Sequence, residues 1–159
     1  MTLMLVNQIG DAILTALNDS PPVGTPATVD ATGEEVATLP AMILHLITDE
    51  TVGMHGSAGD GTSVQLRPPP GPVSKCRAVF VLEVRAETVD GTPARKAPDP
   101  HLAWAIQQLM GSRLGGLAHN VYRTRVEYQQ IQKDRLYVRA AMEFCVDYQT
   151  RVADATANR

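Results

Sequence analysis

The sequence lacks most of the features that usually reveal a chemical function. Only two of its 159 residues are cysteines, Cys76 and Cys145, and they occur in no CxxC or Cys/His spacing. We therefore expect reduced thiols in a cytoplasmic protein rather than a disulfide framework or a zinc site. No run approaches the roughly 20 apolar residues of a membrane span. The apolar start of the chain has no basic n-region, so we expect neither a signal peptide nor a membrane anchor.

Aromatic residues and net charge are also scarce. Aromatics make up 4% of the chain against 44% for all hydrophobic residues, so the core must be built mainly from aliphatic side chains. The 14 basic and 17 acidic residues give a net charge of −3, which provides no electrostatic basis for binding nucleic acid. A chain of this length buries a sizeable core without needing disulfides or bound metal ions. We expect one domain at 1–150, flexible loops near 20–38 and 51–63, and a C-terminal tail at 151–159.

Two segments have the three- and four-residue apolar spacing of an amphipathic helix. The first is 3–17, which ends shortly before a pair of prolines that cannot continue a helix. The second is 100–110, where we expect Asp99 to cap the first turn and Pro100 to occupy a position at which its missing N–H costs nothing. Gly111 is expected to end this helix in the left-handed conformation.

The remaining regular segments predict strands. A short strand is expected near 27–31, and the apolar or alternating runs 39–48 and 76–88 predict two more. The clearest alternation is in "VYRTRVEYQQI" and "LYVRAAMEFCVDYQT", which predict a long antiparallel hairpin over 121–149. The fold class is therefore α+β: a single domain with a mainly antiparallel or mixed sheet, two helices on its apolar face and a long C-terminal hairpin.

Charge and apolar matches together suggest one register for this hairpin. If paired positions sum to 266, aromatic residues meet apolar ones on one face and opposite charges meet on the other. The pairs are Tyr122 with Phe144, Tyr128 with Val138, Glu127 with Arg139, and Arg123 with Glu143. A register slipped by two places retains only Arg125 opposite Glu143. We prefer the first.

No constellation of catalytic, metal-binding or cofactor-binding residues is found. The stretch "VGMHGSAGDG" has no GK[ST] and no GxGxxG after a convincing strand, and Ser57 in "HGSAG" lacks the first glycine of a nucleophile elbow. The histidines form no HExxH motif and no i,i+4 pair. They are His45, His55, His101 and His119. We expect a protein that is not an enzyme and has no cofactor.

Residues 98–150 resemble a known family. The segment "DPHLAWAIQQLMGSRLGGLAHNV", the polar strand "YRTRVEYQQ" and the ending "AAMEFCVDYQT" are similar to the C-terminal half of the tail terminator proteins of long-tailed bacteriophages, also called tail-completion or minor tail proteins. The last strand matches the aromatic-x-V-x-Y-x-T pattern of that family with Phe144, Val146, Tyr148 and Thr150. An N-terminal helix like "VNQIGDAILTAL" is also usual there, whereas residues 20–75 show no resemblance.

This resemblance implies a structural virion protein that is assembled in the host cytoplasm. Tail terminators close into a ring, typically a hexamer, on the head-proximal end of the tail tube, stop tube polymerisation and join the tail to the head connector. The implied partners are further copies of the chain, the tail-tube protein and head–tail connector proteins, with DNA passing through the lumen without sequence recognition and no membrane involved. Expected contact residues, at a subunit or tube interface, are Arg123, Arg125, Glu127, Arg139, Glu143, Met54 and His55.

Two other functions remain open from the sequence. One is another neck, head–tail connector or completion protein of the same kind of particle. The other is a small enzyme or ligand-binding domain with a site around loop 51–63 and His45 or His55, since groups distant in sequence can converge in space. A flat surface with large apolar edges would favour assembly, whereas a pocket with a strongly shifted histidine would favour the enzyme.

Overall fold

The computed structural model describes residues 4–19, 27–29, 39–55, 73–88, 93–132, 136–151 and 154–158. Within these ranges it contains a six-stranded sheet in the order β1-β2-β3-β5-β4, with β6 paired to β5 off this path. The strands are β1 (Ala27–Val29), β2 (Ala41–His55), β3 (Val73–Glu87), β4 (Asn120–Gln132), β5 (Leu136–Arg151) and β6 (Asp154–Asn158). The β1/β2 pair is parallel and the other pairs are antiparallel. The predicted α+β class with a long C-terminal hairpin is confirmed.

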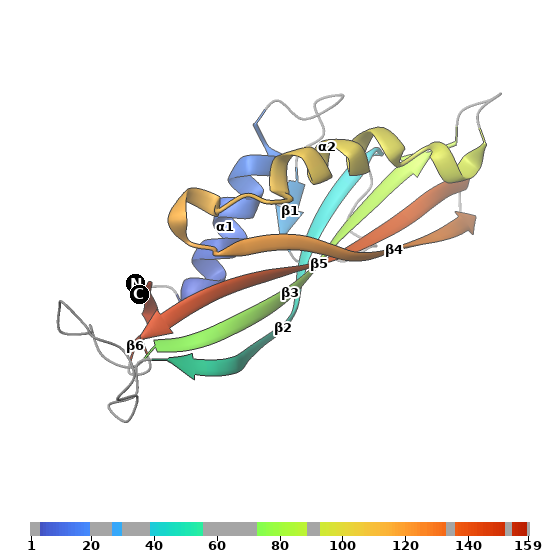
Figure 1. Cartoon of the computed structure of the whole chain (residues 1–159). Helices are drawn as coiled ribbons and strands as arrows, with labels where there is room; N and C mark the ends of the chain where they lie inside the picture. The colour runs from blue at the N-terminus through green and yellow to red at the C-terminus, as the bar shows by residue number, and fades with distance from the viewer. Residues whose placement is uncertain are drawn as a thin grey trace.

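Both α-helices of the described chain pack on the same face of this sheet (Figure 1). They are α1 (Leu5–Leu17) and α2 (Asp99–Leu109), close to the predicted bounds of 3–17 and 100–110. The core lies between them and the even-numbered residues of β3 and β5, whose side chains point to this face. The predicted apolar periodicities therefore identified both the helices and the side of the sheet that they cover.

The predicted cap of α2 is wrong. Asp99 already lies in the first helical turn, and the N-cap is Pro98, which makes no side-chain capping bond. The Asp99 carboxylate is still well placed near the positive end of the helix dipole. At the other end Gly111 adopts φ +74°, as predicted, and its N–H donates to the Val121 carbonyl at 2.9 Å. The end of α2 is thereby tied to the start of β4.

Short 3-10 turns complete the path into and out of α2. One spans Ala94–Lys96, before the helix, and the other spans Leu114–Gly116, after it. In the second turn Gly115 and Gly116 have φ of 69° and 93°, values that favour glycine. This glycine pair therefore turns the chain from α2 toward the hairpin.

Strand β2 is longer than the sequence predicted. The expected strand 39–48 continues to His55, so residues 51–55, expected to open a flexible loop, belong to the sheet. The extension follows from pairing with β3, which includes irregularities between Leu46 and Thr48 and between Thr51 and Gly53. Bulges of this kind keep a long twisted strand in register with its neighbour. The rest of the expected loop, 56–63, lies outside the described residues.

The ends of the chain and the first loop are only partly described. Of the expected loop at 20–38, residues 27–29 form β1, beside Met42–Leu44 of β2. In the expected tail at 151–159, residues 154–158 form β6 along the end of β5. The remaining residues of both segments, apart from Arg151, lie outside the described ranges. The division into a domain at 1–150 and a tail stays a prediction.

The predicted hairpin exists, but its register is wrong. From Arg125 onward paired positions sum to 268, which places Arg125 opposite Glu143 and Tyr128 opposite Ala140. An irregularity at Thr124 then shifts the ladder by one residue, so that Arg123 lies opposite Phe144 and Tyr122 opposite Cys145. The observed pairing beyond the bulge is thus the slipped alternative that had retained only one charge pair. Tyr122 consequently lies on the face opposite the helices, and Val121 is buried in the core instead.

Helix α2 buries a histidine that predicts a pH-dependent stability. His101 is 4% exposed, and its Nδ1 has no hydrogen-bond partner among the described residues. Burial lowers the pKa of His101 below the ordinary value of 6.5. The unfolded chain therefore binds a proton more readily than the folded chain does. The stability that follows from this difference is fully present above pH 6.5 and is lost as the pH falls below it.

We expect His101→Leu to weaken this pH dependence and to raise the free energy of unfolding by about 1 kcal/mol, because an unsatisfied buried polar atom disappears. Urea unfolding at pH 7.5 and pH 5.5 measures both effects. His119→Leu is the matched control, since His119 is exposed. If His101→Leu and the wild type lost equal stability between the two pH values, His101 would not be the group responsible.

Candidate assembly surface

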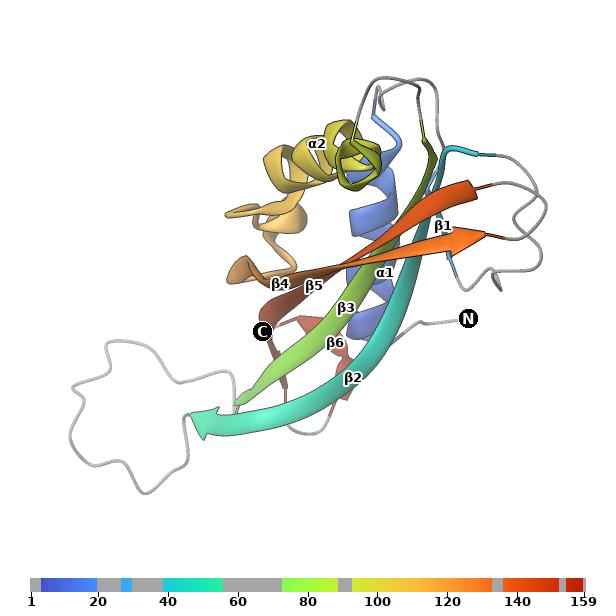
Figure 2. The ribbon, with the colours of Figure 1, turned by 90° about the vertical axis from the view of Figure 1, so that its right-hand side faces the viewer.

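The side of the sheet opposite the helices is polar and ordered. We call it the polar face; it consists of the odd-numbered residues of β3 and β5 together with their cross-strand neighbours on β2 and β4. Neither α1 nor α2 covers it, as the two views of the ribbon show (Figures 1 and 2). Instead, ion pairs and hydrogen bonds link its side chains across the strands. The best developed of these networks surrounds Glu83.

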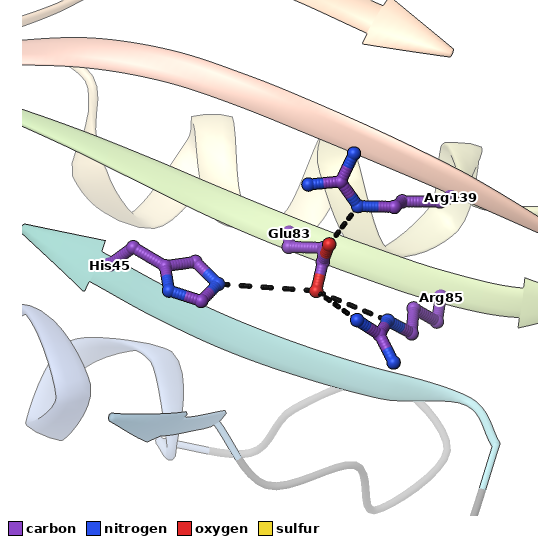
Figure 3. A network of polar contacts seen from close by, with 4 residues as sticks. All are labelled: His45, Glu83, Arg85 and Arg139. Atoms are coloured by element: carbon purple, nitrogen blue, oxygen red, sulfur yellow. Dashed lines mark hydrogen bonds and ion pairs between the residues drawn. The ribbon is translucent and has the colours of Figure 1, made fainter. Parts of the chain in front are cut away.

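Glu83 is a nearly buried carboxylate on the central strand β3, 2% exposed. Arg85 donates to Oε2 through Nη2 at 2.7 Å and through Nε at 3.1 Å, and the Nε of Arg139 donates to Oε1 (Figure 3). The Nε2 of His45, on β2, lies 3.9 Å from Oε2. Three neighbouring strands therefore contribute polar side chains to one carboxylate.

The strand register explains this arrangement. Arg85 on β3 and Arg139 on β5 are direct cross-strand partners, a like-charge pair that would be destabilising alone. Glu83 lies two residues from Arg85 on the same face and diagonally across from Arg139, so its two oxygens can serve both guanidinium groups. The carboxylate thereby bonds to both members of a like-charge pair and offsets the repulsion between them.

A second network lies further along the polar face. Arg77 on β3 donates through Nε to Oδ1 of its cross-strand partner Asp147 at 2.9 Å, and its guanidinium carbon is 5.9 Å from the centroid of the Tyr122 ring. The bond to Asp147 raises the pKa of Arg77 above its ordinary value. Cys145 is buried beside this group, and its burial raises the pKa of the thiol above 9.0. A raised thiol pKa is typical of an inert cysteine rather than a nucleophile.

The third network joins β4 to β5 at the bulge. Arg125 approaches Glu143 at 3.3 Å and Glu127 at 3.4 Å, and the hydroxyl of Thr124 donates to Oε1 of Glu143 at 2.8 Å. Both Arg125 and Glu127 are well exposed, with side chains 62% and 66% accessible. These exposed pairs contribute little to stability, but they keep charged groups available for a partner.

The structure brings together four of the seven contact residues predicted from the sequence. Arg125, Glu127, Arg139 and Glu143 all lie on the polar face. The prediction that Arg123 shares this face is wrong: because of the bulge at Thr124 it lies opposite Phe144, on the helix-bearing side, where it is exposed.

Met54 and His55 do not join this group. They end β2 opposite Ser74 and Val73, whereas Arg139 lies opposite Arg85 at the other end of β3. Their side chains are outside the described set. Sequence reasoning also missed the central role of Glu83 and the pair Arg77 and Asp147. The charged residues interleaved in the apolar run "VFVLEVRAE" of β3 were the available signal, because charges rarely occupy a central strand without partners.

One open groove in the described structure lies away from the polar face. It has a volume of about 920 Å³ and is lined by the last turns of α1 together with Ser112, Leu114 and Gly115. Among the described side chains, none of His45, His101 and His119 lines it, and neither does any predicted contact residue on β4 or β5. Within the same described ranges no three His, Cys, Asp or Glu residues are placed to hold a metal ion. No described helix is long and apolar enough to cross a membrane.

Comparisons with known proteins find matches among solved structures, but not among protein families or curated sequences. No protein-family model matches the chain, and no curated protein sequence matches it. Among solved structures, the chain is similar to a chain of the virion of a native gene transfer agent (GTA) particle, with 19% identity, 92% of each chain covered and a TM-score of 0.46. A similarity of this size does not by itself define a function.

Proposed function

We propose that this chain is a structural virion protein: the tail terminator of a long-tailed bacteriophage or phage-like particle. In this proposal six copies form a ring on the head-proximal end of the tail tube, stop its polymerisation and present the surface that joins the head. Its partners are further copies of itself, the tail-tube protein and the head–tail connector, and DNA passes through the lumen without being read. Virion assembly takes place in the host cytoplasm.

The observation that carries the proposal is the polar face. It is broad, bears three separate ion-pair networks and is covered by neither described α-helix. A surface of ordered charges suits contact with another protein better than it suits chemistry on a small molecule. The proposed contact residues are Arg125, Glu127, Arg139 and Glu143, with Arg123 at the sheet edge and Met54 and His55 at the end of β2.

The family resemblance supports the same function through the core. Phe144, Val146, Tyr148 and Thr150, which match the ending of the family pattern, are all buried on the helix-bearing face of β5. The matching segment thus supplies the strand against which both helices pack. It is a likeness in scaffold, and the polar face adds the surface that an assembly protein needs.

The enzyme and ligand-binding alternative finds less support. His45, one of its two candidate histidines, lies 3.9 Å from Glu83 inside the charged network, and the groove beside α1 is lined by other residues. The side chain of His55 lies outside the described set. A neck or connector protein would need the same kind of surface. Its binding partner distinguishes it from a tail terminator.

The test is capping of tail tubes. The tail-tube protein encoded in the same genome is polymerised with and without this chain, and tube lengths are measured by negative-stain electron microscopy. We expect shorter tubes with one ring-shaped density at a single end, and native mass spectrometry of the free or tube-bound protein should give the ring size. Tubes of unchanged length without end density would contradict the tail terminator function. Binding to purified heads instead would indicate a neck protein.

A further inference from the structure

The sheet has two different edges that no described strand occupies. Strand β1 pairs only with Met42–Leu44, so the outer side of β2 has no described partner strand from Leu46 to its end. At the opposite side of the sheet β4 pairs only with β5 along its whole length. Figure 2 shows β2 extending well beyond β1. Long edges of this kind are templates for pairing with another chain unless they are covered or blunted.

Both edges also expose apolar side chains. Five large hydrophobic residues of the described chain are exposed, and four of them lie on these two strands. They are Leu46 (41%), Ile47 (54%) and Val52 (47%) on β2, and Tyr128 (52%) on β4. Natural edges that stay in solvent are blunted by charges, prolines, bulges or short length. These two edges have charges and bulges, but they are long and carry exposed apolar side chains as well. The exposed set therefore points to edges that are covered in the assembled state.

The charges of the two edges are complementary. Strand β2 contains Asp49 and Glu50 and no lysine or arginine. Strand β4 contains Arg123 and Arg125 against one acid, Glu127. Opposite charges on two surfaces favour their encounter and disfavour self-pairing of either edge. The edges are thus suited to each other rather than each to itself.

We propose that the β2 edge of one copy pairs with the β4 edge of the next, which joins the sheets of neighbouring subunits into one continuous sheet. This inference rests on the proposed ring. The antiparallel β2/β3, β3/β5 and β5/β4 pairs make β2 and β4 run in opposite directions. Copies repeated by rotation about an axis along the strands therefore meet in an antiparallel pair, with the helices on the same side throughout. Such a heterologous contact closes into a ring when the rotation closes.

The face on which each side chain lies selects a register. Glu50 lies opposite Arg77 and Arg125 opposite Glu143, both on the polar face. Antiparallel pairing of Glu50 with Arg125 brings Asp49 next to Val126 and Thr48 next to Glu127, in each case on matching faces. The existing bulge at Ile47 in β2 then places Leu46 opposite Tyr128, both on the helix-bearing face.

This register gives partners to several of the exposed groups of both edges. The two large apolar side chains Leu46 and Tyr128 cover each other. On the polar face Glu50 meets Arg125, and on the other face Arg123 lies diagonally across from Asp49. Cross-strand pairs of these kinds are the units that stabilise antiparallel sheets.

A disulfide test addresses the pairing directly. In the variant Leu46→Cys/Tyr128→Cys the two new thiols would be direct cross-strand neighbours between subunits, within the Cα separation that a disulfide allows. Oxidation should give a ladder of covalent multimers that ends at the ring size and collapses on reduction. Each single variant can form dimers at most, since the native Cys76 and Cys145 are buried. Dimers alone from the double variant would overturn the proposed pairing.

A charge swap provides a second readout that does not depend on cysteine chemistry. Glu50→Lys should raise the protein concentration at which half of the chains are assembled by at least tenfold. Adding Arg125→Glu should bring that concentration most of the way back to the wild-type value. Asp11→Lys, the same charge change on the exposed side of α1, should leave assembly unchanged. No effect of Glu50→Lys would contradict the register. If the wild type formed rings but the double-cysteine variant gave no disulfide ladder, the edge pairing alone would be overturned. If the variant gave the ladder but the protein did not cap tail tubes, the tail terminator function alone would be overturned.

Discussion

Replacing Glu83 with glutamine is expected to lower the free energy of unfolding by about 3–5 kcal/mol, because removing one partner of a buried ion pair leaves an uncompensated charge. Arg85 is 8% exposed and bonds to Glu83 through two nitrogens. Arg139, directly opposite Arg85, depends on the same carboxylate. A neutral amide would leave two neighbouring guanidinium groups without the charge that holds them together.

The measurement is urea or thermal unfolding of Glu83→Gln beside Glu127→Gln. The control makes the same chemical change on the same face, but the Glu127 side chain is 66% exposed and 3.4 Å from Arg125, so its ion pair is worth about 0–1 kcal/mol. For a domain of this size we expect Glu83→Gln to lower the melting temperature by on the order of 10 °C.

A third variant tests whether stability requires the ion pairs themselves or only requires that no buried charge is left without a partner. When a whole buried network is replaced by apolar residues of similar volume, stability is often retained. We therefore expect Glu83→Leu/Arg85→Met/Arg139→Met to be more stable than Glu83→Gln. If Glu83→Gln lay within 1 kcal/mol of the wild type, the carboxylate would not be compensating buried charge, and the network would have to be regarded as a solvated surface.

The helices and most strands followed from the sequence because each has a strong period. The apolar spacing of 3–17 and 100–110 and the alternation in 136–148 are local properties, and local patterns survive folding. The same reasoning fixed which face of the sheet the helices cover. It gave no indication of β6, and it ended β2 too early, since "TDETVGMH" looks like a polar turn until β3 lies beside it.

The hairpin register failed for a physical reason. The preferred pairing was chosen for its exposed charge pairs, although exposed ion pairs contribute too little to decide a register. Burial decides it. Val121 and Val126 both face the core although they are five residues apart, which is impossible in an unbroken strand because side chains alternate. This odd spacing requires the bulge at Thr124, and it was visible in "VYRTRV".

The polar face was only half predictable for the same reason. Alternation placed Arg139 and Glu143 on it, but a one-residue shift at a bulge moves every side chain beyond it to the other face, and Arg123 was misassigned in this way. Glu83 could not be identified as the centre of a network without knowing that β5 lies on one side of β3 and β2 on the other. That adjacency is a property of the topology, not of any local pattern.

Phe144→Ala is expected to cost about 3–5 kcal/mol of stability, the range for removing a large aromatic side chain from a packed core. Phe144 is fully buried and stacks on Phe80, its direct cross-strand partner, with ring centroids 5.7 Å apart and an interplanar angle of 15°. The pair joins β3 to β5 at the centre of the sheet, under both helices. A cavity there cannot be filled by small movements of one strand.

Tyr128→Ala is the matched comparison, since it removes an aromatic ring from the neighbouring strand at a position that is 52% exposed. We expect it to change monomer stability by less than about 0.5 kcal/mol and to weaken assembly instead. Phe144→Ala should do the opposite: the folded fraction should still form rings of wild-type size, while denaturant unfolding shifts to lower concentration. If Phe144→Ala unfolded at wild-type denaturant concentrations, the family-like ending of β5 would not be part of the scaffold. A loss of stability in Tyr128→Ala matching that of Phe144→Ala would mean that the β4 edge supports the fold rather than the contact between subunits.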